Sequence, residues 1–325
     1  MNNRLKTIVD AFPDQRILVI GDVMIDAYCW GKVDRISPEA PVPVVAVNQW
    51  DYRLGGAANV ALNAMALDAK VAICSVVGND NNGKRCLDLF AENGIDTQAL
   101  IESDDRPTTV KTRVIAAGHH LVRIDEEVTF ALNDNEENLL LKAFNEAVHS
   151  FKPNVIVLED YNKGVLTPKV IEQVIHLAQS LNIPTTVDPK KDHFLSYTRC
   201  TLFKPNLKEL KEGLKIDVNP KDAMSVRDAL NTLSQSLQAK MSMVTLSEFG
   251  IAIWDGNDLF QETAHVRKIV DVSGAGDSVI AVASLALSAG ASKNEIAQLS
   301  NLAGGLVCEK VGVVPITREM LYKEI

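Results

Sequence analysis

Short apolar runs recur along the chain, and longer stretches with helical periodicity separate them. The runs lack polar alternation and are rich in β-branched residues, which is typical of parallel strands buried on both faces. They lie at 17–20, 71–77, 155–158, 185–187 and 243–246. This repeated order of strand and helix predicts an α/β fold with a doubly wound, mostly parallel sheet flanked by helices.

The stretches between the runs carry good helix formers and apolar residues at helical spacing. We expect helices at 57–67, 83–93, 135–149, 168–181, 222–237 and 279–289. The last of these is almost entirely apolar but shorter than the ~20 residues that a membrane span needs. We therefore predict that it is buried inside the protein.

Two segments depart from this order, at about 27–54 and 107–126. In the second, apolar and small residues alternate with Lys111 and Arg113, which share one face. Alternation with period two predicts strands that have one face in water. We expect one domain over 1–325 with a small antiparallel β lid, which covers a substrate, a second subunit or both.

Composition narrows the class of protein. The 325 residues are 46% hydrophobic and carry a net charge of −9, so neither disorder nor a nucleic-acid surface is expected. The five cysteines form no CxxC pair, which argues against a zinc ribbon and favours reduced thiols. The first residues contain no apolar leader. We predict a cytoplasmic protein with no membrane partner.

The run from Gly78 to Arg85, GNDNNGKR, nearly matches the P-loop that binds nucleotide phosphates. Its last residue is Arg85, however, and an arginine cannot ligate Mg²⁺ as a serine or threonine hydroxyl does. The asparagine-rich loop is also ordinary turn chemistry. We therefore favour a structural turn here over a nucleotide site.

The sharpest chemical signal is the segment 271–277, DVSGAGD, which leads into the apolar helix. Its glycines let the backbone approach a ligand, and a helix start favours an anion. A carboxylate beside a phosphate is repulsive unless it removes the proton of the attacking hydroxyl. Asp277 is thus a candidate base, and the N–H groups of Gly274, Ala275 and Gly276 are candidates for stabilising the transferred group. Spacing alone equally allows Asp277 to be only a helix cap.

Two further elements are weaker on their own. Asn206 and Glu209 lie three residues apart, so at a helix start they share one face and suit either Mg²⁺-bound water or a capping pair. The glycine pair Gly55-Gly56 precedes Asn59 at another predicted helix start.

Together these elements resemble the ribokinase-like carbohydrate kinases, from about residue 17 to residue 317. The motifs occur in family order, as GGxxN at 55–59, GxDxxG at 78–83, NxxE at 206–209 and DxxGAGD at 271–277. The second motif explains the apparent P-loop as a structural turn of the family.

Longer segments are similar to the heptose 7-phosphate kinases within this family. They lie at 21–26, 35–44, 55–60, 109–113, 123–125, 160–164 and 271–277. The segment 35–44, RISPEAPVPV, is long and unusual, which makes the similarity specific. Most of the family has Thr-Thr or Thr-Gly where this chain has Val272-Ser273, and the heptose kinases share that departure.

The resemblance implies phosphorylation of the anomeric C1 hydroxyl of D-glycero-D-manno-heptose 7-phosphate by ATP. The product would feed ADP- or GDP-heptose synthesis for lipopolysaccharide or surface glycans. Asp277 would be the base, and Asn206 and Glu209 would position Mg²⁺ through water, with no direct protein ligand. The adenine would lie near Ser247, Gly250 and Asn301. Some relatives also use a monovalent cation before the catalytic aspartate.

The sugar site implied by the resemblance contains Asp26, Gly55, Gly56, Asn59 and Asp160. The 7-phosphate needs cations, and the candidates are Lys111, Arg113, Arg123 and Lys163, each of which is also compatible with a solvated surface position. The lid would close over the site and serve as the contact of a homodimer.

Some relatives carry a nucleotidyltransferase as a second domain. With 325 residues we expect either a single-function kinase or a chain that lacks this part, so that the next step falls to another chain or a missing domain. Two rival functions remain: a kinase for another sugar or sugar phosphate, and a non-catalytic sugar- or nucleotide-binding regulator.

Overall fold

The computed structural model describes residues 2–264, 269–310 and 312–325. Its body is built on a nine-stranded sheet in the order β13-β12-β11-β10-β9-β8-β1-β4-β5. The strands from β11 to β5 run parallel, and β12 and β13 are antiparallel additions at one edge. The strands are β1 (Arg16–Gly21), β4 (Lys70–Gly78), β5 (Asp96–Ser103), β8 (Val155–Glu159), β9 (Thr185–Asp188), β10 (Leu202–Phe203), β11 (Met241–Thr245), β12 (Ile251–Trp254) and β13 (Leu259–Glu262).

Helices cover both faces of this sheet. One face carries α1 (Asn2–Asp10), α2 (Ala57–Ala66), α3 (Asn81–Glu92), α8 (Ala275–Ser288), α9 (Lys293–Val307) and α10 (Arg318–Tyr322). The other carries α4 (Asp134–Phe151), α5 (Pro168–Ser180), α6 (Leu207–Leu214) and α7 (Ala223–Leu237). Ile17 and Val19 of β1 pack into the first apolar cluster and Leu18 into the second, because successive strand residues point to opposite faces. Both faces are buried, so the central strands need no polar alternation.

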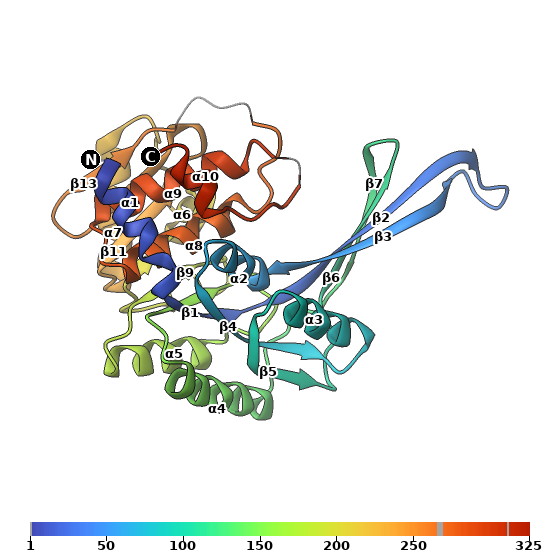
Figure 1. Ribbon diagram of the computed structural model, residues 1–325, viewed down its shortest axis with the longest axis horizontal. Helices are drawn as coiled ribbons and strands as arrows, with labels where there is room; N and C mark the ends of the chain where they lie inside the picture. The colour runs from blue at the N-terminus through green and yellow to red at the C-terminus, as the bar shows by residue number, and fades with distance from the viewer. Residues whose placement is uncertain (1, 265–268, 311) are drawn as a thin grey trace.

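A second, four-stranded sheet projects from the body as a curved arm (Figure 1). It consists of β2 (Val23–Ile36), β3 (Pro43–Gly56), β6 (Val110–Ala116) and β7 (His119–Glu126). Two antiparallel hairpins are joined by a parallel pairing of β2 with β6. Because β3 leads directly into α2, the base of this sheet lies beside the start of that helix.

The structure and the sequence-based expectations agree on the fold class. The five predicted strands and six predicted helices are all present, with ends that differ by a few residues. Helix α8 is buried from Asp277 to Ala286, as expected. No helix in the described ranges is long and apolar enough to cross a membrane. The strands β5, β10, β12 and β13 were not expected.

Candidate active site

Asp277 lies in the first turn of α8, at an open pocket of about 790 Å³. The pocket lies at the carboxyl ends of the parallel strands, where ligands bind in open α/β sheets. The residues that line it come mainly from the ends of β9 and β11, the start of α6 and the loop before α8. They are Tyr161, Asp188, Lys190, Lys204, Asn206, Leu207, Lys208, Glu209, Lys211, Glu212, Thr245, Ser247, Val272, Gly274, Gly276 and Asp277.

The residue that caps α8 is Gly274, with a φ of +76°, and not Asp277. A Cβ at Gly274 would lie 3.0 Å from Nδ2 of Asn59, so the left-handed turn and the close approach of α2 both favour glycine. The first turn of α8 directs N–H groups toward the pocket, although the N–H of Ala275 donates to the carbonyl of Val272 over 3.3 Å. The helix start is therefore built to face a ligand.

Helix α2 positions the start of α8. Asn59 donates from Nδ2 to one carboxylate oxygen of Asp277 over 2.5 Å. One turn further on, Oδ1 of Asn63 accepts from the Ser278 hydroxyl over 2.7 Å and from the Ile316 N–H over 3.0 Å. Asn59, which was expected to line the sugar site, therefore contacts the candidate base directly.

Tyr161 binds the second oxygen of Asp277, with its hydroxyl donating over 2.9 Å. The loop that carries Tyr161 is held by the buried carboxylate of Asp22, which accepts from the N–H groups of Tyr161, Lys163 and Val165 over 2.8–3.1 Å. The sequence analysis did not select Tyr161 as a site residue.

Burial raises the pKa of Asp277 from 3.8 to about 6. The hydrogen bond from Asn59 opposes this shift, the charge of Asp188 adds to it, and the bond from Tyr161 again opposes it. A carboxyl group with a pKa of about 6 is mostly ionised at physiological pH and is still basic enough to accept a proton.

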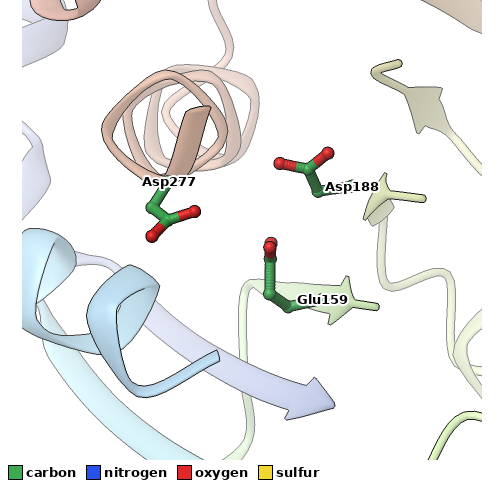
Figure 2. A group of neighbouring side chains, drawn as sticks. All are labelled: Glu159, Asp188 and Asp277. Carbon is green, nitrogen blue, oxygen red and sulfur yellow. The ribbon is translucent and has the colours of Figure 1, made fainter. Parts of the chain in front are cut away.

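Asp277 is one member of a buried cluster of three carboxyl groups (Figure 2). Glu159 at the end of β8 and Asp188 at the end of β9 are the other two, and one oxygen of each residue lies within 4.8 Å of the others. Asp188 is paired with the ammonium group of Lys204 over 2.8 Å. The carboxylate of Asp188 outweighs burial and holds the pKa of Lys204 above its ordinary value. Burial raises the pKa of Asp188, and the charges of Lys204 and Lys190 oppose that rise.

Glu159, Asp188, Lys190 and Lys204 were not selected from the sequence either. Their signal was present, because the apolar runs at 155–158 and 185–187 each end in a carboxylate. Residues that follow neighbouring parallel strands meet at one edge of the sheet. The register pairs Glu159 with Asp188, but that pairing is not readable before strand order is known.

Asn206 and Glu209, which were expected to contact the nucleotide through Mg²⁺, form a reciprocal capping box at the start of α6. The carboxylate of Glu209 also accepts from Nζ of Lys190 over 2.9 Å. The structural role weighed for this pair is therefore present, and both residues line the pocket as well. Their oxygens already have protein partners, which fits an indirect contact with Mg²⁺ through water.

Of the three residues expected near the adenine, only Ser247 lines the pocket. Gly250 forms a tight turn with a φ of +85°, where a Cβ would lie 2.0 Å from the carbonyl oxygen of Glu262. Asn301 donates from Nδ2 to the carbonyl of Thr263 over 2.9 Å. Both residues lie against the backbone that follows β13, and neither is part of the pocket lining.

The glycine pair Gly55-Gly56, which was expected in the sugar site, allows close packing at the base of the lid. A Cβ at Gly55 would lie 2.5 Å from the Asp26 carboxylate, and one at Gly56 would lie 2.4 Å from the carbonyl of Asp22. Asp26 itself forms an ion pair with Arg113. Asp160 points the other way, into the core, where it accepts from the Tyr197 hydroxyl over 2.7 Å. It therefore lies on the opposite side of the chain from its neighbours Glu159 and Tyr161.

The basic residues expected to meet the sugar phosphate all have acidic partners. Lys111 and Lys163 share the carboxylate of Glu127, over 2.8 and 2.7 Å. Arg123 pairs with Asp125 over 2.9 Å, and Lys111 also approaches Asp125. The structure thus shows an ion-pair network on the lid in place of free cations.

The apparent P-loop is a structural turn, as expected. Asp80 caps α3 and accepts from the N–H of Gly83 over 2.7 Å and from the N–H of Thr108 over 2.8 Å. A Cβ at Gly83 would lie 2.0 Å from the carbonyl of Gly78. The motif ties the main sheet to the segment that enters the lid.

Residues 14–319 match the family described as pfkB family carbohydrate kinase. The chain belongs to this family. The resemblance drawn from the motifs is therefore confirmed, and the chain is a carbohydrate kinase of the pfkB type. Kinases of this family use ATP and Mg²⁺.

Among the relatives of this pfkB kinase is the "Bifunctional protein HldE" of Trichlorobacter lovleyi, 40% identical over 306 residues. The match covers 93% of this chain but only 61% of that protein's length. Phosphofructokinase-2 from Escherichia coli in complex with potassium has a similar structure, with a TM-score of 0.78 and 22% identity over 95% of this chain and 97% of that one. Arabidopsis thaliana ribokinase complexed with ribose and ATP gives a TM-score of 0.71 at 17% identity, over 95% and 98% of the two chains. These two likenesses concern the fold.

Proposed function

We propose that this pfkB kinase transfers the γ-phosphoryl group of ATP to the anomeric C1 hydroxyl of D-glycero-D-manno-heptose 7-phosphate, giving heptose 1,7-bisphosphate. The observation that carries the reaction type is the carboxylate of Asp277, buried at the start of α8 and oriented by Asn59 and Tyr161. The substrate is supported by the heptose-kinase segments, above all 35–44, and by 40% identity to a protein named HldE.

In this mechanism the C1 hydroxyl gives its proton to Asp277 while its oxygen bonds to the γ-phosphorus. The bond from that phosphorus to the β–γ bridging oxygen breaks, and ADP leaves. The start of α8 offers backbone N–H groups and the positive end of the helix dipole to the transferred group. Since both carboxylate oxygens of Asp277 have a fixed donor, the base is held in one orientation.

The phosphates of ATP would lie along the pocket wall that carries Lys190, Lys204 and Lys208. Asn206 and Glu209 offer a carboxamide and a carboxylate at one helix start, a donor set that suits a hard cation held through water. Mg²⁺ bound there would neutralise phosphate charge. A monovalent cation near the loop before Asp277 is a further element of the proposal, by analogy with the potassium complex of the neighbouring fold.

The 7-phosphate would meet the ion-pair network at the base of the lid. There Lys111, Lys163 and Arg123 face only two carboxylates, Glu127 and Asp125, so the network has one cation more than it has anions. A phosphate would satisfy this excess without leaving a carboxylate unpaired. Arg113 forms an ion pair with Asp26, so it adds no net positive charge for the phosphate.

The arm also supports the proposal of a homodimer through the lid. Large apolar side chains of the arm are 37–60% exposed, among them Trp30, Ile36, Val47, Trp50, Val122 and Ile124. An exposed apolar patch on a projecting sheet is typical of a protein–protein contact. We propose a second copy of this chain as the partner that covers this patch.

The HldE relative from T. lovleyi is called bifunctional, and this chain spans 61% of its length. We assign only the kinase step to the residues described here. Nucleotide-heptose formation for lipopolysaccharide or surface glycans would be the use of its product.

A substrate panel tests the proposal. ADP release is measured with heptose 7-phosphate, the same heptose without its phosphate, and fructose 6-phosphate. We expect the highest kcat/KM for heptose 7-phosphate and a loss of at least tenfold without the phosphate. Higher activity with an unphosphorylated sugar would reject the substrate assignment and leave the kinase assignment intact.

A further inference from the structure

Glu159 is a buried carboxyl group that takes no part in the proposed phosphoryl transfer. It ends β8, its side chain is fully buried, and neither carboxyl oxygen has a hydrogen-bond partner within the part of the chain that the structure describes. An ionised carboxylate without a donor is among the most unfavourable groups to bury. Some other feature must therefore remove its charge.

The neighbours of Glu159 show where the charge of the cluster resides. Its side chain points between Asp188 and Asp277 (Figure 2). Asp188 has a cation partner, Lys204, over 2.8 Å, and Asp277 accepts two hydrogen bonds, from Asn59 and Tyr161. Three carboxyl groups this close cannot all ionise, and the one without cation or donor is the one that retains a proton.

We propose that Glu159 is a positioning residue that stays a neutral carboxylic acid beside the catalytic base and thereby keeps Asp277 ionised. The inference rests on the proposed role of Asp277 as the base. A negative charge on Glu159 would draw a proton onto Asp277 and repel the incoming phosphate. A neutral acid of the same size fills the space without either effect.

Four charged groups lie near Glu159, two of them acidic and two basic. Asp188 on β9 and Asp277 on α8 disfavour its ionised form, whereas Lys204 after β10 and Lys190 after β9 favour it. Burial and the two aspartates outweigh the lysines and raise the pKa of Glu159 well above its ordinary value. This direction agrees with the geometric argument.

The first test detects the proton on the carboxyl group of Glu159 directly. Infrared difference spectra between wild type and Glu159→Gln at pH 7 should show the C=O band of a protonated carboxyl group, lost in the variant. The matched control is Glu172→Gln, an exposed glutamate on α5, which should show loss of a carboxylate band. A carboxylate band for Glu159 overturns the proposal. If Glu159→Gln does not fold, wild-type protein with ¹³C-labelled glutamate carboxyl groups should show the same acid band, isotope-shifted.

Stability gives a second readout that needs no substrate. The native protein holds a proton on Glu159 that the unfolded chain releases above its ordinary pKa, so rising pH costs the wild type stability that the variant keeps. The melting temperature of Glu159→Gln relative to wild type should therefore increase from pH 5 to pH 8. A difference in melting temperature between variant and wild type that stays constant with pH would contradict a neutral Glu159.

Kinetics connects the group to Asp277. Because glutamine is neutral like the protonated acid, Glu159→Gln should leave the acid limb of the pH profile of kcat/KM in place. An acid limb displaced to lower pH would show that Glu159 was charged. Binding of Mn²⁺ alone to the wild type, with loss of binding in the variant, would instead make the cluster a cation site and also overturn the proposal. Failure of the heptose assignment would leave the infrared and stability results unaffected.

Discussion

At the scale of single residues, the account depends on one carboxylate and the donors that hold it. Asp277 is fixed by Asn59 from α2 and by Tyr161 from the loop after β8. Asp277 and Asn59 could be selected from the sequence because they belong to short motifs. Tyr161, Glu159 and Asp188 could not, since their contacts depend on which strands are neighbours.

Replacement of the base is the simplest test at this scale. Asp277→Asn keeps the size of the side chain but cannot accept the proton, so kcat should fall by about 10²–10⁴-fold while ATP affinity is retained. In the wild type, kcat/KM should fall below a pH of about 6, where Asp277 becomes protonated. The measurements are steady-state rates between pH 5 and 9 and calorimetric ATP binding. Unchanged turnover of the variant would exclude Asp277 as the base.

Removing the hydroxyl of Tyr161 should change the pKa of Asp277 without abolishing its function as the base. The Tyr161 hydroxyl stabilises the ionised form of Asp277, so Tyr161→Phe should raise the pKa of Asp277 and move the acid limb to higher pH. Tyr197→Phe is the control, because it removes a tyrosine hydroxyl that donates to a different carboxylate, Asp160, in the core. It should lower stability and leave the acid limb in place. Equal shifts in both variants would argue against a specific role for Tyr161.

At the scale of elements, the contact between α2 and α8 keeps the catalytic loop in place. Oδ1 of Asn63 satisfies both the hydroxyl of Ser278 and the backbone N–H of Ile316. Asn63→Ala leaves the Ile316 N–H unpaired and leaves the Ser278 hydroxyl only its longer contact with the Gly274 carbonyl, so it should lower the free energy of unfolding by about 2 kcal/mol. Chemical denaturation measures this, with the exposed Asn145→Ala on α4 as control. Equal stability of the two variants would contradict the anchoring role.

The lid is the element that should govern assembly. Ile36 is 60% exposed on the arm, and Ile36→Lys should shift sedimentation from dimer toward monomer. Leu195→Lys, at an apolar residue that is 46% exposed outside the lid, should leave the sedimentation unchanged. A wild type that sediments as a monomer at micromolar concentration would reject the dimer.

Elements with a strong pattern were predictable, and elements without one were not. The buried central strands and the capped helices carry local signals in their own residues. Strand β10 has only two residues, Leu202 and Phe203, and is defined by its pairing with β9 and β11. In the same way, the parallel pairing of β2 with β6 joins segments far apart in the sequence and has no local signature.

At the scale of the whole molecule, the net charge of −9 conceals a strongly uneven distribution. Four lysines line the pocket, and two of the three buried carboxyl groups of the cluster, Asp188 and Asp277, line it as well. This local clustering of charges could not be located from the sequence, because it depends on β8, β9 and β10 ending side by side in the sheet.

The central claim is that phosphate is transferred to the anomeric hydroxyl of an already phosphorylated heptose. The most direct measurement is NMR of the product formed from heptose 7-phosphate and ATP. We predict a new phosphorus–carbon coupling at C1, with the 7-phosphate intact and none of this product formed by Asp277→Asn. Phosphate at another carbon, or no product with this sugar alongside rapid turnover of an unphosphorylated one, would contradict the account.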